Sequence, residues 1–319
     1  MNPHLTTFTA RSPQDLVALV PILIGFAPAD SLVMLTLAGP RQFHARIDLP
    51  DDDRHVGDVA HALIAPAVQH AASAVAFVVY TDDERLAKVL GREVEHQCRD
   101  AQIGVLDVIR VAGGRWFSRS GPRWGVPFDP SAHPFTAQAV LEGRAVLRSR
   151  EELAASVAPD PVAAGAVSQA MPGVSTEIVD PSEFSRWLGT RDAVSLSAED
   201  VARILHAVQD PVVRNAVWAG LDRQQCGEAV EVWAAVLRRA PASEPLATAL
   251  VAGLTGMLAW RAGNGALAWC ALDREKATGC RTSLVGLVGD LLETAADPAM
   301  LDRVSPTCAE DGPNSGRRR

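Results

Sequence analysis

The sequence predicts an α/β domain with a mixed sheet and flanking helices, followed by an all-α domain with helical-hairpin character. Within the first 120 residues, short apolar runs typical of strands alternate with segments of helical period, which is the pattern of a layered α/β domain. Some strand-like runs also follow one another directly, which indicates antiparallel neighbours and hence a mixed sheet. From residue 196 onward the apolar period is helical.

These patterns divide the chain into four parts. We expect the α/β domain at residues 1–157, and a linker with one short helix at 158–195, where Pro, Ala and Gly are frequent. The helical domain is expected at 196–304. Residues 305–319 are polar and end in three arginines, so we predict a disordered tail there.

The N-terminal third contains the clearest local signals. Ser12 is followed by Pro13 and Asp15, and this combination starts a helix because Ser caps it and Pro fits its first turn. The apolar run that follows ends near Gly25, and residues 31–37 then fit a buried strand. Further strands are predicted at 43–49, 74–80, 105–111 and 116–118, and helices at 56–71 and from the acidic segment at 81–84 to about residue 100.

The second half is predicted to be helical after an irregular stretch. Residues 120–134 show no period and are expected to form a long ordered loop, or strap, across the first domain. Ser197 and Asp200 form a capping box before a helix, and short joints such as residues 262–264 indicate helical hairpins. The longer helices are predicted at 229–239, 246–261, 265–273 and 283–294.

Composition excludes some classes of function. The chain has 319 residues, 48% of them apolar and 21% charged, as in ordinary globular proteins. Its net charge of -8 argues against nucleic-acid binding, which needs clustered basic side chains. The chain has 28 arginines and only two lysines, which we interpret as the codon bias of a GC-rich genome and not as a phosphate site.

We expect no membrane association and a cytoplasmic location. Residues 16–38 are apolar and long enough to cross a bilayer, but Pro21, Pro28 and Asp30 interrupt them, so a buried helix followed by a strand fits better. The five cysteines are odd in number and lack CxxC spacing, which favours reduced thiols over disulfides or zinc ligands. The N-terminus has no features of a signal peptide.

The first candidate for chemistry is the acidic segment after the strand at 74–80. The carboxyl end of a strand in an open α/β sheet is where ligands and divalent cations bind, and Asp82 and Asp83 are candidate catalytic residues that could hold Mg²⁺. The alternative is structural: Asp82 caps the next helix, while Asp83 and Glu84 complement its dipole.

The second candidate is the loop at residues 25–31. Asp30 and Ser31 are candidate catalytic residues there, as proton acceptor and proton donor. The spacing and the lysine of a phosphate-binding loop are both missing. The alternative is a structural turn in which the Asp30 side chain accepts hydrogen bonds from nearby backbone amides.

The third candidate is a binding surface made of basic and aromatic side chains. We single out the binding residues Arg115, Trp116, Arg123 and Trp124, with Arg119 between them, because guanidinium groups and indoles grip acidic or aromatic ligands. The alternative is that the tryptophans anchor the strap and the arginines pair with carboxylates of the neighbouring domain. No set of histidines or cysteines has the spacing of metal ligands, so no metal site is predicted.

Two motifs carry a resemblance to a known family. Gly25–Leu32 fits the pattern GFxPxDSL, and Gly114–Ser118 fits GRWxS. With Val213–Asn215 and Trp260–Ala268, they resemble an actinobacterial family catalogued as a domain of unknown function, over residues 12–297. The resemblance implies a fold and a bacterial cytoplasmic setting, and it implies nothing about a reaction.

Together these observations favour a non-catalytic module that binds a protein or a small-molecule ligand and uses no cofactor. The alternative is a metal-assisted hydrolase or a nucleotide-modifying enzyme that uses Asp82, Asp83 and Asp30, with Mg²⁺ as its cofactor.

Overall fold

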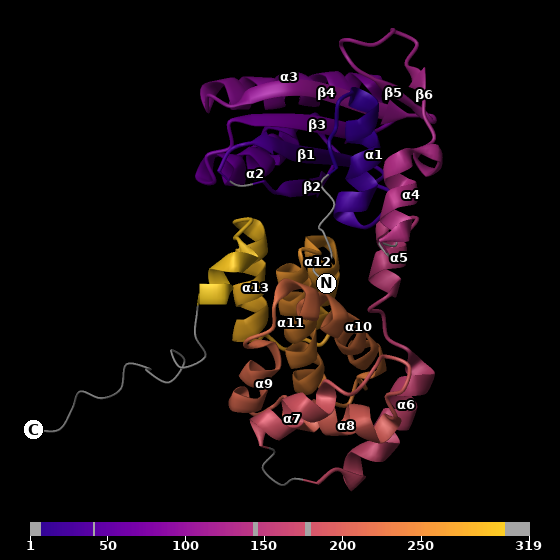
Figure 1. Cartoon of the computed structure of the whole chain (residues 1–319), viewed down its shortest axis with the longest axis vertical. Coiled ribbons are helices and arrows are strands. Elements are labelled where there is room, and N and C mark those ends of the chain that lie inside the picture. Colours follow the sequence, from indigo (N-terminus) through magenta and orange to yellow (C-terminus); the bar gives the residue numbers. More distant parts are fainter. Residues whose placement is uncertain (1–7, 41, 143–145, 176–179, 304–319) are drawn as a thin grey trace, which may run out of the picture. The chain divides into compact units, whose positions relative to one another are not determined.

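A mixed sheet of six strands forms the centre of the N-terminal half in the computed structural model, which describes residues 8–40, 42–142, 146–175 and 180–303. The chain divides into two compact units, residues 1–152 and 153–319, and each is described by itself. The boundary therefore lies a few residues before the one expected at 157. The predicted fold class, α/β followed by a helical part, is confirmed (Figure 1).

The strand order in the sheet is β2-β1-β3-β4-β5-β6. The strands are β1 (Ser31–Ala38), β2 (His44–Asp48), β3 (Ala74–Tyr80), β4 (Gly104–Ala112), β5 (Arg115–Phe117) and β6 (Val126–Pro127). Strands β3 and β4 are parallel, and the other neighbouring pairs are antiparallel. The α3 helix (Glu84–Asp100) provides the crossover that a parallel pair requires.

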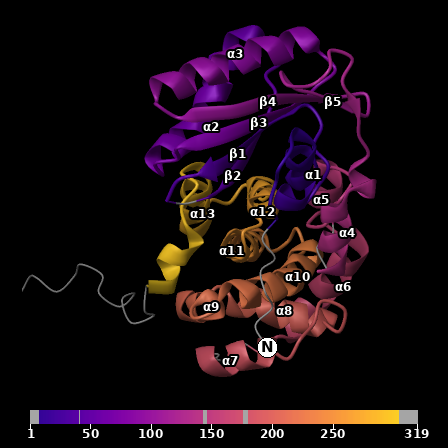
Figure 2. The ribbon, with the colours of Figure 1, turned by 45° about the horizontal axis from the view of Figure 1, so that its top comes forward.

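Burial on both faces of the sheet determines where the N-terminal helices lie. Side chains alternate along β3, so Phe77 joins one core cluster and Val78 joins the other. The first cluster packs against α2 (Val56–Gln69) and α3, and the second packs against α1 (Pro13–Ile24) (Figures 1 and 2). Strand β3 is buried from Val75 to Tyr80, as expected of an apolar strand that is covered on both faces.

The start of α1 also links it to α4 (Pro134–Leu141). Ser12 caps α1 as predicted and forms a capping box with Asp15, and the second carboxylate oxygen of Asp15 lies 3.2 Å from His133 Nε2. The Phe135 amide donates to His133 Nδ1 at 3.3 Å, so the neutral ring carries its proton on Nε2. Partial burial acts to raise the pKa of Asp15, but hydrogen bonds from Arg11, Ser12 and His133 hold it below its usual value.

The strap differs from the expected irregular loop at two points. Residues Val126 and Pro127 form β6, which pairs with β5 through Trp116 opposite Val126. After the short 3-10 helix Pro130–Ala132, the chain enters α4, and α5 (Arg150–Ala155) follows. Strand β6 has only two residues and contains a proline, which fits the edge of the sheet, and its pairing depends on a distant segment that local pattern does not reveal.

The C-terminal unit is made of helices packed around α11 (Pro245–Ala262). This helix is buried from Ala247 to Arg261 and packs against α10, α12 and α13; Figure 2 shows it beside α10 and α12. A Cβ added to Gly256 would lie 2.5 Å from Leu272 Cδ1, so α11 and α12 approach closely at this glycine. The other helices are α6 (Pro161–Ala170), α7 (Pro181–Leu188), α8 (Ala198–Ala207), α9 (Pro211–Trp218), α10 (Arg223–Arg239), α12 (Gly265–Lys276) and α13 (Ser283–Glu293), followed by the 3-10 helix Pro298–Arg303.

The predicted linker at 158–195 is a folded part of the second unit. It contains two helices instead of one, because Asp160 caps α6 and Asp180 caps α7, each followed by a proline in the first turn. Helix α6 packs against α8, and α7 packs against α9. The predicted tail at 305–319 lies outside the described residues. None of the described helices has the length and apolarity needed to cross a membrane.

Truncation of Phe77 tests the importance of the β3 core. This side chain is fully buried in the cluster that packs against α2 and α3, so Phe77→Ala should destabilise the N-terminal unit by about 3–5 kcal/mol. Urea unfolding followed by circular dichroism gives this difference. The control is Val68→Ala on α2, where the side chain is 53% exposed and the change should stay within about 0.5 kcal/mol. Equal effects of the two variants would contradict this assignment of the core.

His44 at the start of β2 predicts a pH dependence of stability. Burial of its ring disfavours the imidazolium and lowers the pKa from 6.5 to about 4. Above pH 6.5 both folded and unfolded chains hold it neutral; as the pH falls towards 4, the unfolded chain binds a proton that the folded chain does not. We expect a loss of about 2 kcal/mol over this window, somewhat less than the full shift because the residue is partly exposed.

The measurement is the free energy of unfolding at several pH values. His44→Gln should remove this part of the pH dependence, whereas His61→Gln, at an exposed position on α2, should keep it. If the wild type and His44→Gln lose stability in parallel between pH 6.5 and about 4, the pH dependence does not come from a buried, neutral His44 ring.

Candidate functional site

The loop between α1 and β1 is held by hydrogen bonds to a later part of the chain. Gly25 ends α1 with φ +87°, a left-handed conformation that glycine adopts without strain, and its carbonyl accepts a hydrogen bond from the Leu147 amide at 2.9 Å. The Ala27 amide donates to the Leu147 carbonyl, also at 2.9 Å. The GFxPxDSL segment is therefore fixed on both sides by backbone bonds.

Ser31 is buried, and its hydroxyl group is engaged on both sides. Its Oγ donates to the Ala29 carbonyl at 2.5 Å and accepts from Arg46 Nε at 2.9 Å. The Arg46 side chain also pairs with Asp48 and lies 5.7 Å from the centre of the Phe26 ring. The Ser31 hydroxyl thus helps to hold the loop, and its role as a proton donor stays a prediction.

Asp30 is exposed and has a φ of +41°, a conformation that Asp tolerates better than most residues. Its backbone carbonyl accepts a hydrogen bond from the Leu49 amide at 2.9 Å. In the structural alternative, the Asp30 carboxylate accepts hydrogen bonds from nearby backbone amides. Among the described residues, the backbone carbonyl of Asp30 closes the turn instead.

At the carboxyl end of β3, Asp83 caps α3. Its carboxylate accepts from the amides of Arg85 and Leu86, and these bonds, first that from Leu86, hold the pKa of Asp83 below its usual value. The structural alternative had assigned the cap to Asp82, one residue earlier. Asp82 is exposed, and Thr81 turns the chain by accepting the Asp83 amide on Oγ1 at 3.1 Å.

The two predicted catalytic segments lie at the same end of the sheet. Ser31 on β1 stands opposite Tyr80 on β3, so Asp30 before the first strand and Asp82 after the second flank neighbouring strand ends. Within the described part of the chain, no group of three or more His, Cys, Asp or Glu side chains is placed to hold a metal ion.

The four predicted binding residues fall into two pairs. Arg115 donates from Nε to the Trp124 carbonyl at 2.9 Å and from Nη2 to the Gly125 carbonyl at 3.2 Å, so its guanidinium closes the strap. Trp116 is 8% exposed and belongs to the core against α1. The other pair, Arg123 and Trp124, is exposed on the strap, where the Trp124 side chain is 74% exposed.

The structural alternative therefore describes only part of this surface, and the binding role of the four residues stays a prediction. Trp116 anchors the strap as the structural alternative expected, but Trp124 does not. The partners of Arg115 are backbone carbonyls and that of Arg119 is Glu95, all within the same unit and not in a neighbouring one.

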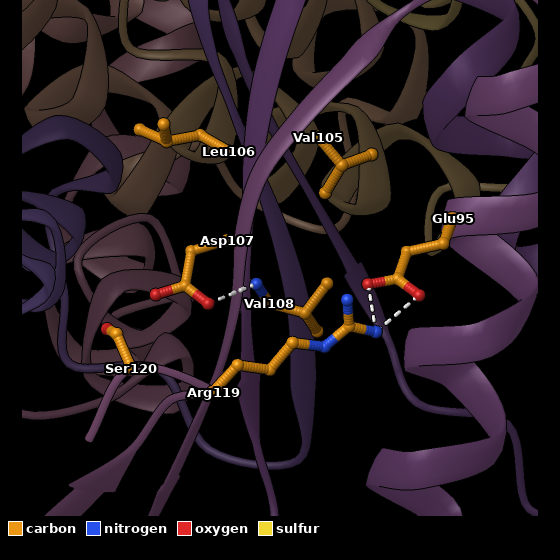
Figure 3. A pocket seen from close by; sticks show the side chains of 7 residues that line it. All are labelled: Glu95, Val105, Leu106, Asp107, Val108, Arg119 and Ser120. Atoms are coloured by element: carbon orange, nitrogen blue, oxygen red, sulfur yellow. Dashed lines mark hydrogen bonds and ion pairs between the residues drawn. The ribbon is translucent and has the colours of Figure 1, made fainter.

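A pocket of about 120 Å³ lies along β4 and was not predicted from the sequence. We call it the β4 pocket; Figure 3 shows its lining residues, Glu95, Val105, Leu106, Asp107, Val108, Arg119 and Ser120. A β-bulge forms its wall: Val75 faces Val105 and Phe77 faces Val108, so two residues of β4 stand against Ala76 alone. Bulges re-aim side chains, and this one leaves Leu106 68% exposed.

The polar groups of the β4 pocket are organised around Asp107. One oxygen of its carboxylate accepts the Val108 amide at 2.8 Å, and the other accepts Ser118 Oγ at 2.5 Å. Ser118 Oγ in turn lies 3.1 Å from Ser120 Oγ. Arg119 extends past Val108 to form an ion pair with Glu95 of α3 (Figure 3). An acidic residue between apolar neighbours in the strand VLDVIRV is the signal that could have revealed this site.

The fold and these sites define a two-unit protein, α/β followed by helical, with a small polar pocket at the edge of its sheet. The model of the family described as "Domain of unknown function (DUF4192)" matches residues 13–299, so the chain belongs to this family. Comparisons with curated proteins and with solved structures give no match.

Replacement of Arg115 by lysine tests its role in closing the strap. A lysine keeps the charge but cannot donate to both carbonyls, and a lost charge-assisted hydrogen bond of about 1.5 kcal/mol raises the population of the open strap roughly tenfold. We expect Arg115→Lys to be cleaved by trypsin after Arg119 and Arg123 about tenfold faster than wild type, as measured by mass spectrometry. Arg123→Lys, at an exposed position, should be cleaved like wild type. Equal rates for both variants would show that Arg115 does not hold the strap.

Proposed function

We propose that the chain is a non-catalytic binding protein, which recognises another protein or a small ligand. This proposal rests on one observation: two of the candidate reactive groups form structural hydrogen bonds. The Ser31 hydroxyl bonds to Ala29 and Arg46, and the Asp83 carboxylate caps α3. A nucleophile or base whose hydrogen-bonding capacity holds backbone and neighbouring side chains is poorly placed for chemistry.

The size of the β4 pocket supports a macromolecular ligand over a cofactor. Sites for cofactors and drug-sized molecules enclose roughly 300–1,000 Å³, several times the volume of about 120 Å³ found here. A pocket of this size accommodates a single side chain, and an exposed leucine beside it suits contact with a protein. We therefore favour a protein partner and propose that no cofactor takes part.

We further propose a cytoplasmic location in an actinobacterium. Cys98 and Cys280 carry free thiols, which fits a reducing compartment. The net charge of -8 again argues against nucleic acid as a partner. The rival, a metal-assisted hydrolase or nucleotide-modifying enzyme, draws support from the shared position of Asp30 and Asp82 at one end of the sheet.

Thermal-shift titration of the full chain with Mg²⁺, Mn²⁺ and nucleotides separates the two functions. For a non-catalytic binding protein we expect no saturable rise in melting temperature, because the exposed carboxylates then bind these ions only weakly. The matched variants are Asp82→Asn, which removes the exposed acid after β3, and Asp58→Asn, which removes an exposed acid on α2. A saturable stabilisation that Asp82→Asn abolishes and Asp58→Asn preserves would overturn the proposal in favour of the enzyme.

A further inference from the structure

Most of β4 has a strand on only one side. The strand has nine residues, but β5 pairs only with its last part, from Arg110 opposite Phe117 to Ala112 opposite Arg115. On the opposite side, β3 pairs with β4 from Gly104 onward. Among the described residues, no strand pairs with residues 104–109 on this side; Ser118, Arg119 and Ser120 lie beside part of this edge, and the β4 pocket lies along it.

The side of β4 that faces away from β3 still has main-chain groups to offer. The Val111 carbonyl bonds the Thr81 amide after β3, and main-chain groups alternate sides along a strand, so Val108 points outward. Its amide is occupied by the Asp107 carboxylate at 2.8 Å. Such a local bond, like the bulge beside it, is a device by which proteins protect an open edge from indiscriminate pairing.

Two acidic side chains, Asp107 and Glu95, line the pocket at this edge of β4. The Asp107 carboxylate accepts from Val108 and Ser118, and the described residues provide no basic side chain for it. The other acid of the pocket, Glu95, does have a cationic partner, Arg119, whose side chain crosses the strand at Val108 (Figure 3). That side chain is 74% exposed, so the ion pair covers the edge but is screened by water and easily exchanged.

We propose that residues 105–109 of β4 dock an extended segment of a partner protein as an additional strand. The main chain of the segment pairs with the free side of β4, an aliphatic side chain packs on Leu106, and a lysine or arginine binds Asp107. This inference rests on the proposed binding function and names the class of its partner.

Three features select an extended basic segment over other partners. The open side of a strand is complementary to another strand, since it offers main-chain donors and acceptors at regular intervals. The exposed Leu106 beside it gives a contact for an apolar side chain. Asp107 lacks a cation, and the guanidinium of Arg119 on neighbouring Glu95 shows which kind of group the pocket accepts.

The experiment selects ligands without assuming their sequence. A phage-displayed library of random dodecapeptides is panned against the full chain, and enriched peptides are synthesised with a fluorescent label and titrated by anisotropy. We expect enriched sequences with a lysine or arginine and aliphatic residues at alternate positions. Hydrogen exchange of the 104–109 amides should slow when the peptide binds. N-methylation of the alternate peptide amides that face β4 should abolish binding.

Protein variants then locate the site. Asp107→Asn keeps an oxygen for the Val108 amide, so the edge retains its shape while the charge is lost, and binding should weaken about tenfold. Leu106→Asn, at an exposed position, should weaken it about fivefold or more. Arg119→Ala removes the cover and should tighten binding a few-fold. Asp82→Asn is the matched control and should bind like wild type.

The proposal is overturned if no peptide is enriched, or if enriched peptides bind Asp107→Asn and Leu106→Asn as tightly as wild type. Peptides that tolerate amide N-methylation but depend on Asp107 would show side-chain recognition without an added strand, which also overturns it. None of these outcomes decides the proposed binding function, which the metal and nucleotide titration tests without any peptide.

Discussion

The N-terminal unit depends on burying both faces of two adjacent strands. Along β1 and β3, alternate side chains enter the two core clusters, for example Leu32 and Phe77 on one face and Val33 and Val78 on the other. Such a pair must be covered by helices on both sides, because every residue left uncovered would expose an apolar side chain. Within the sheet, this constraint places solvent-exposed polar groups at the strand ends and on the outer strands.

Loops around this core and in the helical unit are fixed by a recurrent interaction, in which one guanidinium donates to two backbone carbonyls. Arg115 closes the strap in this way; Arg239 donates to the Leu196 and Ala193 carbonyls at 2.7 and 3.0 Å, and Arg261 to those of Trp218 and Leu221 at 2.7 and 2.6 Å. A lysine has no rigid fork and would not span two acceptors in this geometry. These three arginines therefore have a structural role that composition alone does not reveal.

Local signals predicted the elements, and long-range pairing decided the sites. The strand at 74–80 and the helix start capped by Ser12 were predicted correctly, since each depends on neighbouring residues. Sequence could not separate buried Trp116 from exposed Trp124, because Trp116 lies within the sheet between Val111 and Val126, whereas Trp124 lies outside the strands. Nor could it reveal the β4 pocket, which arises from a two-against-one register between β3 and β4 and from a contact between Glu95 and Arg119.

Protection of an edge and its use by a partner are compatible when the protecting bonds are weak. An exposed ion pair contributes about 0–1 kcal/mol, whereas each main-chain hydrogen bond of an added strand contributes about 0.5–1.5 kcal/mol. A segment that forms two or three such bonds outcompetes the cover of Arg119, while a brief encounter with an unrelated strand forms too few to do so. The Asp107 carboxylate adds selectivity, because an acidic segment would meet a like charge at the point where its backbone must approach most closely. The same residues thus keep the edge closed to most strands and open to a basic one.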